Sequence, residues 1–350
     1  MSAAVLIVTG DPWILDGLLR LAAAADIKAA VARAAEQAGP GWRGAALILV
    51  GADLADEPVL RGAPRRPGVV LVAAAGDPEV YRKAVGIGAQ DVAMLPDADM
   101  RLADLMAVAA EPAGRPGEVL CVAGGRGGAG ASVLSAVLGI VAARRGMRTL
   151  LVDGDPLGGG LDLVLGQEHL EGARWPEFSA LRGRLSSAAL QGSLPATSGP
   201  AVLSWHRGET EPVTAETMRS VLAAAVRGFD LVVVDLPRRL AEAEAEVLRA
   251  ARRALLVVPA EVRATVAAGR IASELRRHAS DIRVVVRGPA AGGLTGDVIA
   301  HALDLPLAGE VAVDRRIPTA LEHGDLVRVS RRGPLTDLCR KLLGDIESAS

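Results

Sequence analysis

The 350-residue sequence has few aromatic side chains, which make up 2% of it, and contains only two cysteines. Surfaces that stack nucleic-acid bases need Phe, Tyr or Trp, so this composition argues against a protein built around aromatic stacking platforms. Cys121 and Cys339 lie far apart, which excludes a disulfide framework and a cysteine-rich metal site. The five histidines follow no ligand spacing, and we therefore expect no zinc centre.

Sequence features of membrane insertion and secretion are also missing. No apolar run approaches the roughly 20 residues that cross a bilayer. The N-terminal residues lack the basic start and the apolar core of a signal peptide. The formal net charge of -2 provides no overall attraction to nucleic acid or anionic lipid. We therefore expect a cytoplasmic protein, and its length and 50% hydrophobic content predict two domains with sizeable cores.

The first part of the chain alternates short apolar runs with Ala- and Leu-rich stretches. Four runs have the composition of buried parallel strands, namely residues 4–10, 45–51, 69–75 and, more weakly, 91–95. Residues 14–25 and 78–86 have helical spacing and the length of crossover helices. This alternation predicts a flavodoxin-like α/β domain over residues 1–110, followed by a Pro- and Gly-rich linker over residues 111–117.

The same alternation resumes after the linker and predicts a second α/β domain, with a mostly parallel sheet, over residues 118–350. Strands are expected at 119–123, 149–153, 230–237, 254–260 and 282–286. Helices are expected at 132–145, 214–226, 241–253 and 262–278, with a loop-rich stretch at 156–208. Residues 334–346 carry leucines and isoleucine at helical spacing, which predicts a helix docked on the sheet; a helix lying on a membrane is the alternative.

A glycine-rich segment, GRGGAGAS at residues 125–132, separates the first strand of the second domain from its first helix. Gly125, Gly130 and Ser132 match a phosphate-binding loop of the form G-x-x-x-x-G-K-[ST], in which backbone N–H groups and the helix start face a phosphate. Ala131 stands where the pattern has lysine, whose charge-assisted hydrogen bond is worth about 1.5–3 kcal/mol. The motif indicates a phosphate loop with weakened affinity, and a glycine-rich turn without a ligand stays open.

Two acidic segments follow at the ends of predicted strands. Asp153 and Asp155 lie in VDGDP, and Asp235 ends the strand LVVVDLP. Carboxylates there could orient water or hold a metal at the edge of the sheet where ligands bind, although aspartates also cap loops. The three elements together predict a nucleotide site at Gly125, Arg126, Gly127, Gly128, Ala129, Gly130, Ala131, Ser132, Asp153 and Asp235, with Asp155 as a catalytic candidate.

These segments resemble the MinD/ParA superfamily of deviant Walker ATPases, whose loop has the form KGGxGK[ST]. The resemblance places Arg126 at the first lysine of that loop and Ala131 at the second, and no obvious residue replaces the second lysine. It implies that Asp155 positions water, that Ser132 and Asp235 bind Mg²⁺ beside ATP, and that the protein forms a homodimer. The adenine-contacting Asn of the family would fall near residues 286–287 and is missing.

Within the superfamily, GDPLGGGLDLVLG and VVVRGPAAGGL are similar to the CpaE-like branch and to actinobacterial septum site-determining proteins. Residues 1–110 resemble a response-regulator receiver that has lost its phosphotransfer residues. Only Asp11 remains of the acidic pair, Val50 and Gly51 occupy the phosphoacceptor position, and Leu95 replaces a lysine. A phosphorelay role is therefore not expected, and such a pseudo-receiver implies localisation or partner binding.

Three functional hypotheses follow. The first is a positioning protein for septum placement or tight-adherence pilus assembly, which dimerises and binds division or pilus proteins. It hydrolyses ATP weakly or not at all, and its partners recruit it to the septum, the pole or the inner membrane face. The second is a working ATPase in which Arg126 supplies the missing charge. The third, least favoured, is nonspecific DNA binding; its arginine cluster also fits a solvated face paired with acidic neighbours. That cluster comprises Arg315, Arg316, Arg328, Arg331 and Arg332.

Overall fold

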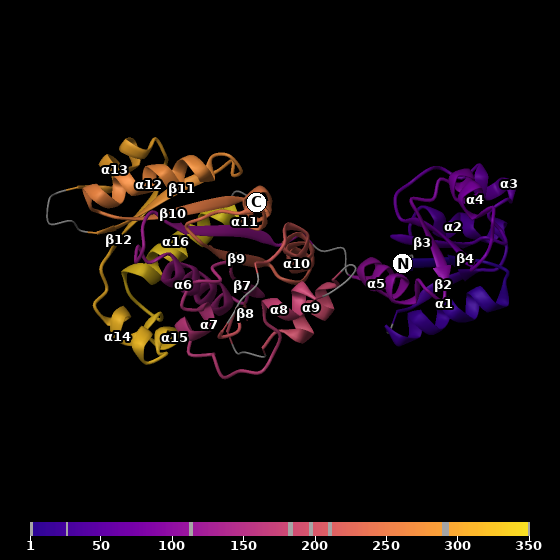
Figure 1. Ribbon diagram of the computed structural model, residues 1–350, viewed down its shortest axis with the longest axis horizontal. Helices are drawn as coiled ribbons and strands as arrows, with labels where there is room; N and C mark the ends of the chain where they lie inside the picture. The colour runs from indigo at the N-terminus through magenta and orange to yellow at the C-terminus, as the bar shows by residue number, and fades with distance from the viewer. Residues whose placement is uncertain are drawn as a thin grey trace. The chain divides into compact units, whose positions relative to one another are not determined.

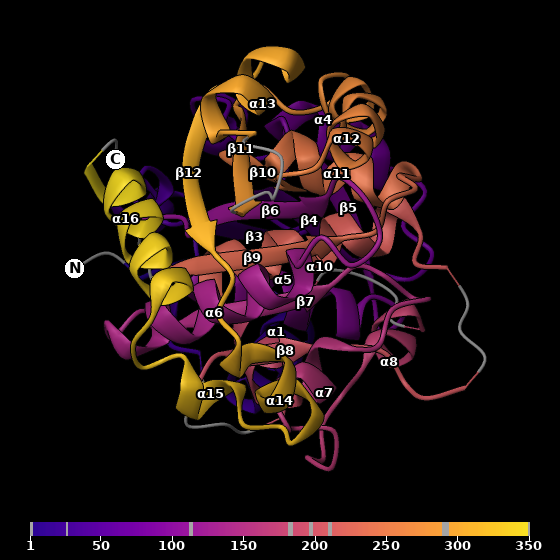
Figure 2. The same ribbon diagram turned by 90° about the vertical axis from the view of Figure 1, so that its left-hand side faces the viewer.

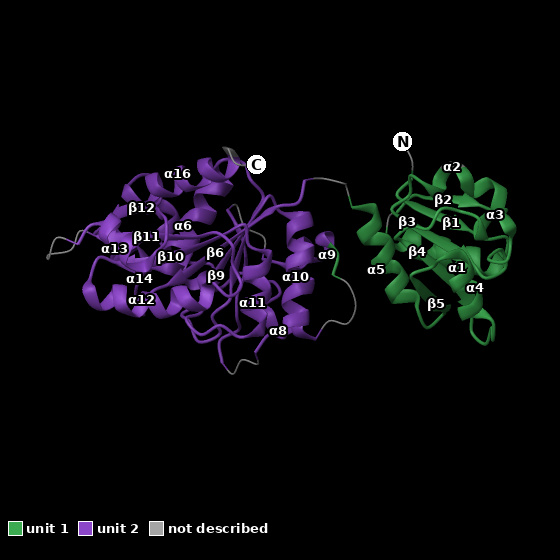
Figure 3. Ribbon diagram, turned by 90° about the horizontal axis from the view of Figure 1, so that it is seen from above, with its two compact units in different colours: residues 1–113, 182–186 green, residues 114–181, 187–350 purple. Residues whose placement is uncertain are grey.

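The computed structural model describes residues 3–25, 27–111, 115–180, 185–195, 199–208, 212–288 and 294–348. The chain divides into two compact units, residues 1–113 with 182–186 and residues 114–181 with 187–350 (Figure 3). The boundaries 1–110, 111–117 and 118–350 stay a prediction. Within the predicted linker, residues 112–114 lie outside the described residues, as do residues 289–293 of the segment VVVRGPAAGGL.

The first unit is a five-stranded parallel sheet in the order β2-β1-β3-β4-β5. Its strands are β1 Val5–Val8, β2 Ala29–Ala32, β3 Leu47–Gly51, β4 Val69–Ala74 and β5 Asp91–Leu95. Its helices are α1 Pro12–Ala24, η1 Ala35–Ala38, α2 Gly39–Trp42, α3 Pro58–Arg61, α4 Val80–Ile87 and α5 Asp99–Ala110. The sequence did not predict β2, because its AAVA run is too short and too alanine-rich to stand out as a buried strand.

Alternate residues of the strands enter two separate cores, one on each face of this sheet. On β1, Val5 and Ile7 pack in the core that includes α1 and α5, whereas Leu6 and Val8 pack in the core that includes α3 and α4. A sheet covered on both faces explains why its strands are continuously apolar rather than alternating. The predicted flavodoxin-like α/β fold is confirmed.

The second unit has a seven-stranded sheet in the order β12-β11-β10-β6-β9-β7-β8, and all its neighbouring strands are parallel (Figures 1 and 2). The strands are β6 Glu118–Gly124, β7 Thr149–Asp153, β8 Ala201–Leu203, β9 Leu231–Leu236, β10 Arg253–Pro259, β11 Ile282–Gly288 and β12 Leu307–Ala312. β6 is the central strand. The carboxyl ends of all seven strands therefore meet at one edge, where the predicted loop also lies.

Helices cover both faces of this sheet. The longer ones are α6 Ala131–Arg144, α10 Ala215–Gly228, α11 Glu242–Ala250, α12 Val262–Leu275, α13 Gly296–Leu303 and α16 Pro334–Ser348. The shorter ones are α7 Leu161–Val164, α8 Trp175–Ser179, α9 Ser187–Ser193, α14 Arg316–Glu322 and α15 Leu326–Val329. Figure 2 shows α16 beside the sheet on one side, and α11 and α12 on the other. α6 is apolar almost all round because it lies between the sheet and α16.

The C-terminal helix α16 packs on α6 and β12, as the sequence predicted. Its residues Leu338, Leu342 and Ile346 are buried in the same core as α6, so the apolar stripe is already covered by protein. This arrangement supports the docked helix over one lying on a membrane. Among the helices of the described residues, none combines the length and the hydropathy that spanning a bilayer would need.

The described part of residues 156–208 is rich in loops, as predicted, but this stretch also includes short elements that the sequence did not identify. It contains the short helices α7, α8 and α9, and the edge strand β8. These elements have three to seven residues, too few for hydrophobic periodicity to identify them. β12 and α13–α15 were not predicted either. The helix expected at 241–253 ends at Ala250, because β10 begins at Arg253.

Candidate functional site

The glycine-rich loop joins the carboxyl end of the central strand β6 to the first turn of α6. Gly128 and Gly130 have φ angles of 68° and 100°, in the left-handed region that side chains other than glycine's disfavour. Gly130 precedes α6, and no side chain caps this helix start. The first N–H groups of a 14-residue helix are thus directed at the edge of the sheet, where they can bind an anion.

The start of the loop is fixed to the neighbouring strand. The N–H of Gly125 donates to the carbonyl of Val257 on β10 at 2.9 Å. A Cβ atom on Gly125 would lie 2.8 Å from the Cβ of Ala268 on α12, which is closer than non-bonded Cβ contacts in proteins. Glycine is therefore required here by packing, whereas at Gly128 and Gly130 it is required by backbone conformation.

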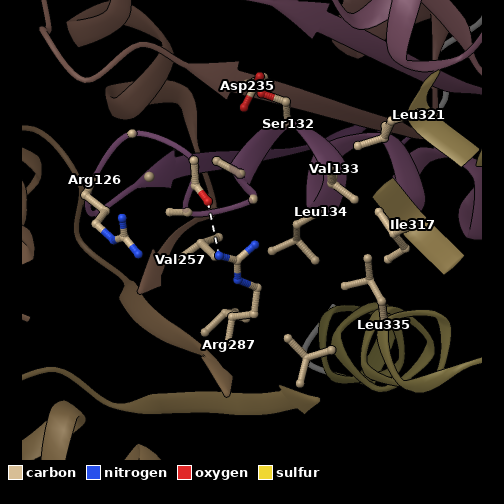
Figure 4. A pocket seen from close by; sticks show the side chains of 18 of the residues that line it. Arg126, Ser132, Val133, Leu134, Asp235, Val257, Arg287, Ile317, Leu321 and Leu335 are labelled. Carbon is tan, nitrogen blue, oxygen red and sulfur yellow. Dashed lines mark hydrogen bonds between the residues drawn. The ribbon is translucent and has the colours of Figure 1, made fainter. Parts of the chain in front are cut away.

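Ser132 and Asp235, the two predicted magnesium ligands, lie side by side (Figure 4). The Ser132 side chain is hydrogen-bonded to the carboxylate of Asp235, and Ser135 donates to Oδ1 of the same carboxylate at 3.3 Å. Burial raises the pKa of Asp235 to about 7, although the Ser132 hydrogen bond opposes the shift. A buried carboxylate beside a hydroxyl, at the helix start, is a donor set that suits Mg²⁺ with a nucleotide phosphate.

Asp153 is paired in register with Asp235 on the adjacent strand, but its carboxylate binds groups of its own chain. Oδ2 accepts hydrogen bonds from the N–H of Leu161 at 2.9 Å and from the Ser204 hydroxyl at 3.1 Å, and Oδ1 accepts from the N–H of Asp155 at 3.2 Å. Burial raises the pKa of Asp153 to about 6. Its visible role is to shape the segment between β7 and α7, and direct nucleotide contact stays a prediction.

Two tryptophans support Asp153 from the other side, and the sequence interpretation missed them. The indole N–H groups of Trp175 and Trp205 donate to the carbonyl of Asp153 at 2.7 and 3.0 Å, and their ring centroids are 5.8 Å apart. Both side chains are buried. The available signal was the rarity of tryptophan, since two of the four in the chain lie in the stretch expected to be rich in loops.

Asp155 borders the same cavity as the loop. Its Oδ1 accepts from the N–H of Leu157 at 3.1 Å, and its carbonyl accepts from Gly158, so the residue lies in a tight turn. Gly154 allows this turn to approach β9, because a Cβ there would lie 2.7 Å from the carbonyl oxygen of Asp235. Leu157 is 91% exposed at the tip of the turn.

The cavity next to the loop has a volume of about 520 Å³, within the range of small-molecule sites. Its polar end is formed by the loop, Asp155 and Asp235. Its other end has apolar walls, and Figure 4 shows that they come from α6, α14 and α16 as well as the sheet. The apolar residues include Val133, Leu134, Val257, Val285, Val311, Ile317, Leu321 and Leu335.

Three arginines lie in the cavity wall, and only Arg126 was predicted. Arg126 donates to Glu261, the residue that precedes α12, at 2.6 Å, and its Nε is buried without a partner among the described residues. Arg287, on β11, donates from Nη2 to the carbonyl of Gly128 at 3.2 Å. Arg238 follows the Asp235 strand. The N–H groups of the loop, these cations and the Ser132–Asp235 pair together fit a magnesium-bound nucleoside polyphosphate.

The carboxyl edge of the first unit differs from the sequence interpretation in one respect. Asp53 lies two residues beyond Gly51, and its Oδ2 accepts from the N–H groups of Gly10 and Asp11 at 2.7 and 3.0 Å. Its Oδ1 accepts from the Thr9 hydroxyl at 2.7 Å. An aspartate is thus present near the phosphoacceptor position, held by donors of the neighbouring loop. No cluster of three metal-ligating side chains occurs in the part of the chain that the structure describes.

The C-terminal arginine cluster borders a separate surface hollow of about 680 Å³ at α14 and α15. Arg316 pairs with Asp314 at 2.6 Å, and Arg328 pairs with Asp325 at 2.9 Å. Two of the five arginines are therefore paired with acidic neighbours.

Comparison with known proteins agrees with both units. Residues 8–117 match the family described as "Rv3660c-like, CheY-like N-terminal domain". Over 344 residues, 97% of each chain, the sequence is 37% identical to the uncharacterized protein Rv3660c of Mycobacterium tuberculosis strain H37Rv. It is 26% identical over 250 residues to the septum site-determining protein MinD of Bacillus subtilis, which covers 65% of this chain and 90% of that protein.

Solved structures show the same fold for the second unit. A ParA family ATPase from Chlorobium tepidum matches with a TM-score of 0.59 and 16% identity, over 66% of this chain and 99% of that one. The septum site-determining protein MinD from Pyrococcus horikoshii, solved as a complex with Mg-ADP, matches with a TM-score of 0.52 and 18% identity, over 65% and 95%. The predicted P-loop NTPase-like fold is confirmed.

Proposed function

The chain belongs to the Rv3660c-like family within the MinD/ParA superfamily, and from this we propose that it is a spatial regulator that binds Mg-ATP weakly and hydrolyses it slowly or not at all. The observation that carries the proposal is the combination of a formed phosphate-binding loop and Ser132–Asp235 pair with Ala131 in place of lysine. The binding half of the site is retained. The residue that most directly neutralises charge in phosphoryl transfer is absent.

The position of Arg126 bears on dimerisation. Within this chain its guanidinium is paired with Glu261. In the MinD/ParA superfamily, which the loop resembles, the lysine at the position of Arg126 reaches across the dimer to the nucleotide phosphates bound by the second subunit. We propose that dimerisation breaks the Arg126–Glu261 pair and that Leu157, exposed beside the cavity, packs against the second copy.

The cellular role follows from the relatives and belongs to the same proposal. MinD of Bacillus subtilis is named a septum site-determining protein. We propose that this protein acts in septum placement or in tight-adherence pilus assembly by binding division or pilus proteins. The pseudo-receiver would provide a docking surface that brings the cytoplasmic protein to the septum, the pole or the inner membrane face.

A working ATPase is the second candidate, because Asp155 borders the same cavity as the loop. A fluorescent ATP analogue titrated with Mg²⁺, a phosphate-release assay and light scattering distinguish the two. We expect saturable, Mg²⁺-dependent binding, dimer formation on binding, and phosphate release that Asp155→Ala leaves unchanged. Asp235→Asn should abolish the Mg²⁺ dependence, whereas Asp345→Asn, on the exposed side of α16, should not.

Two results would change the conclusion. Rapid phosphate release that Asp155→Ala removes would establish the working ATPase instead. Absence of nucleotide binding by the folded wild-type protein, at concentrations up to the millimolar range, would leave the loop as a glycine-rich turn without a ligand.

A further inference from the structure

Arg287 carries a positive charge to the loop from a distant part of the sequence. It lies near the carboxyl end of β11, two strands away from β6 in the sheet. Side chains two residues apart on a strand share a face, and Val285 is buried on the α6 face of the sheet. Arg287 therefore projects on that face as well, where α6 begins.

The position of the guanidinium is defined by two contacts. Nη2 donates to the carbonyl oxygen of Gly128 at 3.2 Å, and a Cβ atom on Gly130 would lie 3.5 Å from Nη1. Gly130 directly precedes Ala131, the position that lacks the lysine. Figure 4 shows Arg287 beside the loop, across from the Ser132–Asp235 pair.

The charge of Arg287 is not neutralised by a carboxylate among the described residues, in contrast to that of Arg126, which is paired with Glu261. It faces the N-terminus of α6, which carries partial positive charge of its own. Two positive groups that border the same cavity form an electrostatic site for an anion. Among the described residues Arg287 is bonded only through Nη2, which leaves Nε and Nη1 as donors for phosphate oxygens.

We infer that Arg287 supplies the cation that binds the nucleotide phosphates in place of the lysine missing at Ala131. The inference rests on the proposed nucleotide binding and concerns which residue of this chain makes it possible. The sequence alone offered no obvious replacement for that lysine. The replacement comes from a strand 159 residues away, rather than from the loop.

The test compares Arg287→Gln, which removes the charge, with Arg287→Lys, which retains it. Arg283→Gln is the matched control, because Arg283 is on the same strand at its opposite end, where it pairs with Asp281. Affinity for a fluorescent ATP analogue with Mg²⁺ is measured at two salt concentrations, together with displacement by inorganic tripolyphosphate and by adenosine. Melting temperatures establish that each variant is folded.

We expect Arg287→Gln to weaken binding of the analogue and of tripolyphosphate about 10- to 100-fold, as for the loss of a charged hydrogen bond. Arg287→Lys should lose less than about fivefold, and Arg283→Gln should bind like the wild type. Displacement by adenosine should not change. Adding Ala131→Lys to Arg287→Gln should restore affinity, because either cation can then meet the phosphates.

The inference is overturned if Arg287→Gln binds as tightly as the wild type. It is also overturned if Gln and Lys at this position weaken binding equally and adenosine is affected as much as tripolyphosphate, since Arg287 would then contact the base. Should the Gln variant not fold, Arg287→Lys alone decides: retained affinity supports a charge contact, and its loss contradicts one. A wild-type protein that binds no nucleotide refutes the proposed function itself, and that result is distinct from these.

Discussion

Replacing Ala131 by lysine tests the description of the loop most directly. Ala131 is the first residue of α6 and is half-buried in the cavity wall. A lysine there would add a charge-assisted hydrogen bond to a bound phosphate, worth about 1.5–3 kcal/mol. Repulsion from Arg287, and from the helix N-terminus by about 0.3–1 kcal/mol, disfavours the lysine in the free protein. An anion that neutralises these charges relieves part of that repulsion.

The expected net gain is about 1–2 kcal/mol in binding, which is roughly a 5- to 30-fold tighter Kd for Mg-ATP. The ligand-free variant should at the same time melt at a lower temperature than the wild type, because of the added repulsion. Calorimetric titration and thermal unfolding measure the two effects, which have opposite signs. Ala131→Met, of similar length and without charge, should not tighten binding. A folded Ala131→Lys protein with unchanged or weaker affinity would refute the phosphate cradle described above.

Other predictions concern stability and dimerisation. Leu342→Ala, at a side chain 1% exposed on the buried face of α16, should cost about 2–5 kcal/mol in urea unfolding. A loss below about 0.5 kcal/mol, with vesicle binding by the wild type, would favour the membrane-lying helix. Burial acts to raise the pKa of Asp281, but hydrogen bonds from arginines, including buried Arg253, outweigh it and lower the pKa below 3.8. The stability from this pair is therefore present above that value and lost as the pH falls through the lowered pKa, so Asp281→Asn should destabilise by about 1–3 kcal/mol at pH 7. The difference from wild type should shrink below about pH 4, and a constant difference down to pH 3 would contradict the assignment. Glu261→Gln frees Arg126 from an exposed ion pair worth about 0–1 kcal/mol. We expect it to strengthen nucleotide-dependent dimerisation up to about fivefold, as measured by light scattering. A weaker dimer would show that the Arg126–Glu261 pair assists dimerisation.

The sequence by itself determined the fold class and the position of the glycine-rich loop between a strand and a helix, because both depend on local properties. Continuous apolar runs such as residues 230–237 can be buried only in a sheet covered on both faces. Gly128 and Gly130 adopt the left-handed backbone conformation, which is a local property of the chain and favours glycine. Asp235 could be placed because it lies at the carboxyl end of its strand, and the end of a strand fixes the edge of the sheet at which a residue lies.

Only the tertiary structure decided which other side chains reach the loop. The order β12-β11-β10-β6-β9-β7-β8 does not follow the order in the chain, and it brings Arg287 to Gly128 although 159 residues separate them. The same applies to Trp175 and Trp205, which meet the carbonyl of Asp153 from separate segments. These contacts form because strand order and helix packing minimise the exposed apolar surface of the whole unit. No short stretch of the sequence indicates which arrangement achieves this.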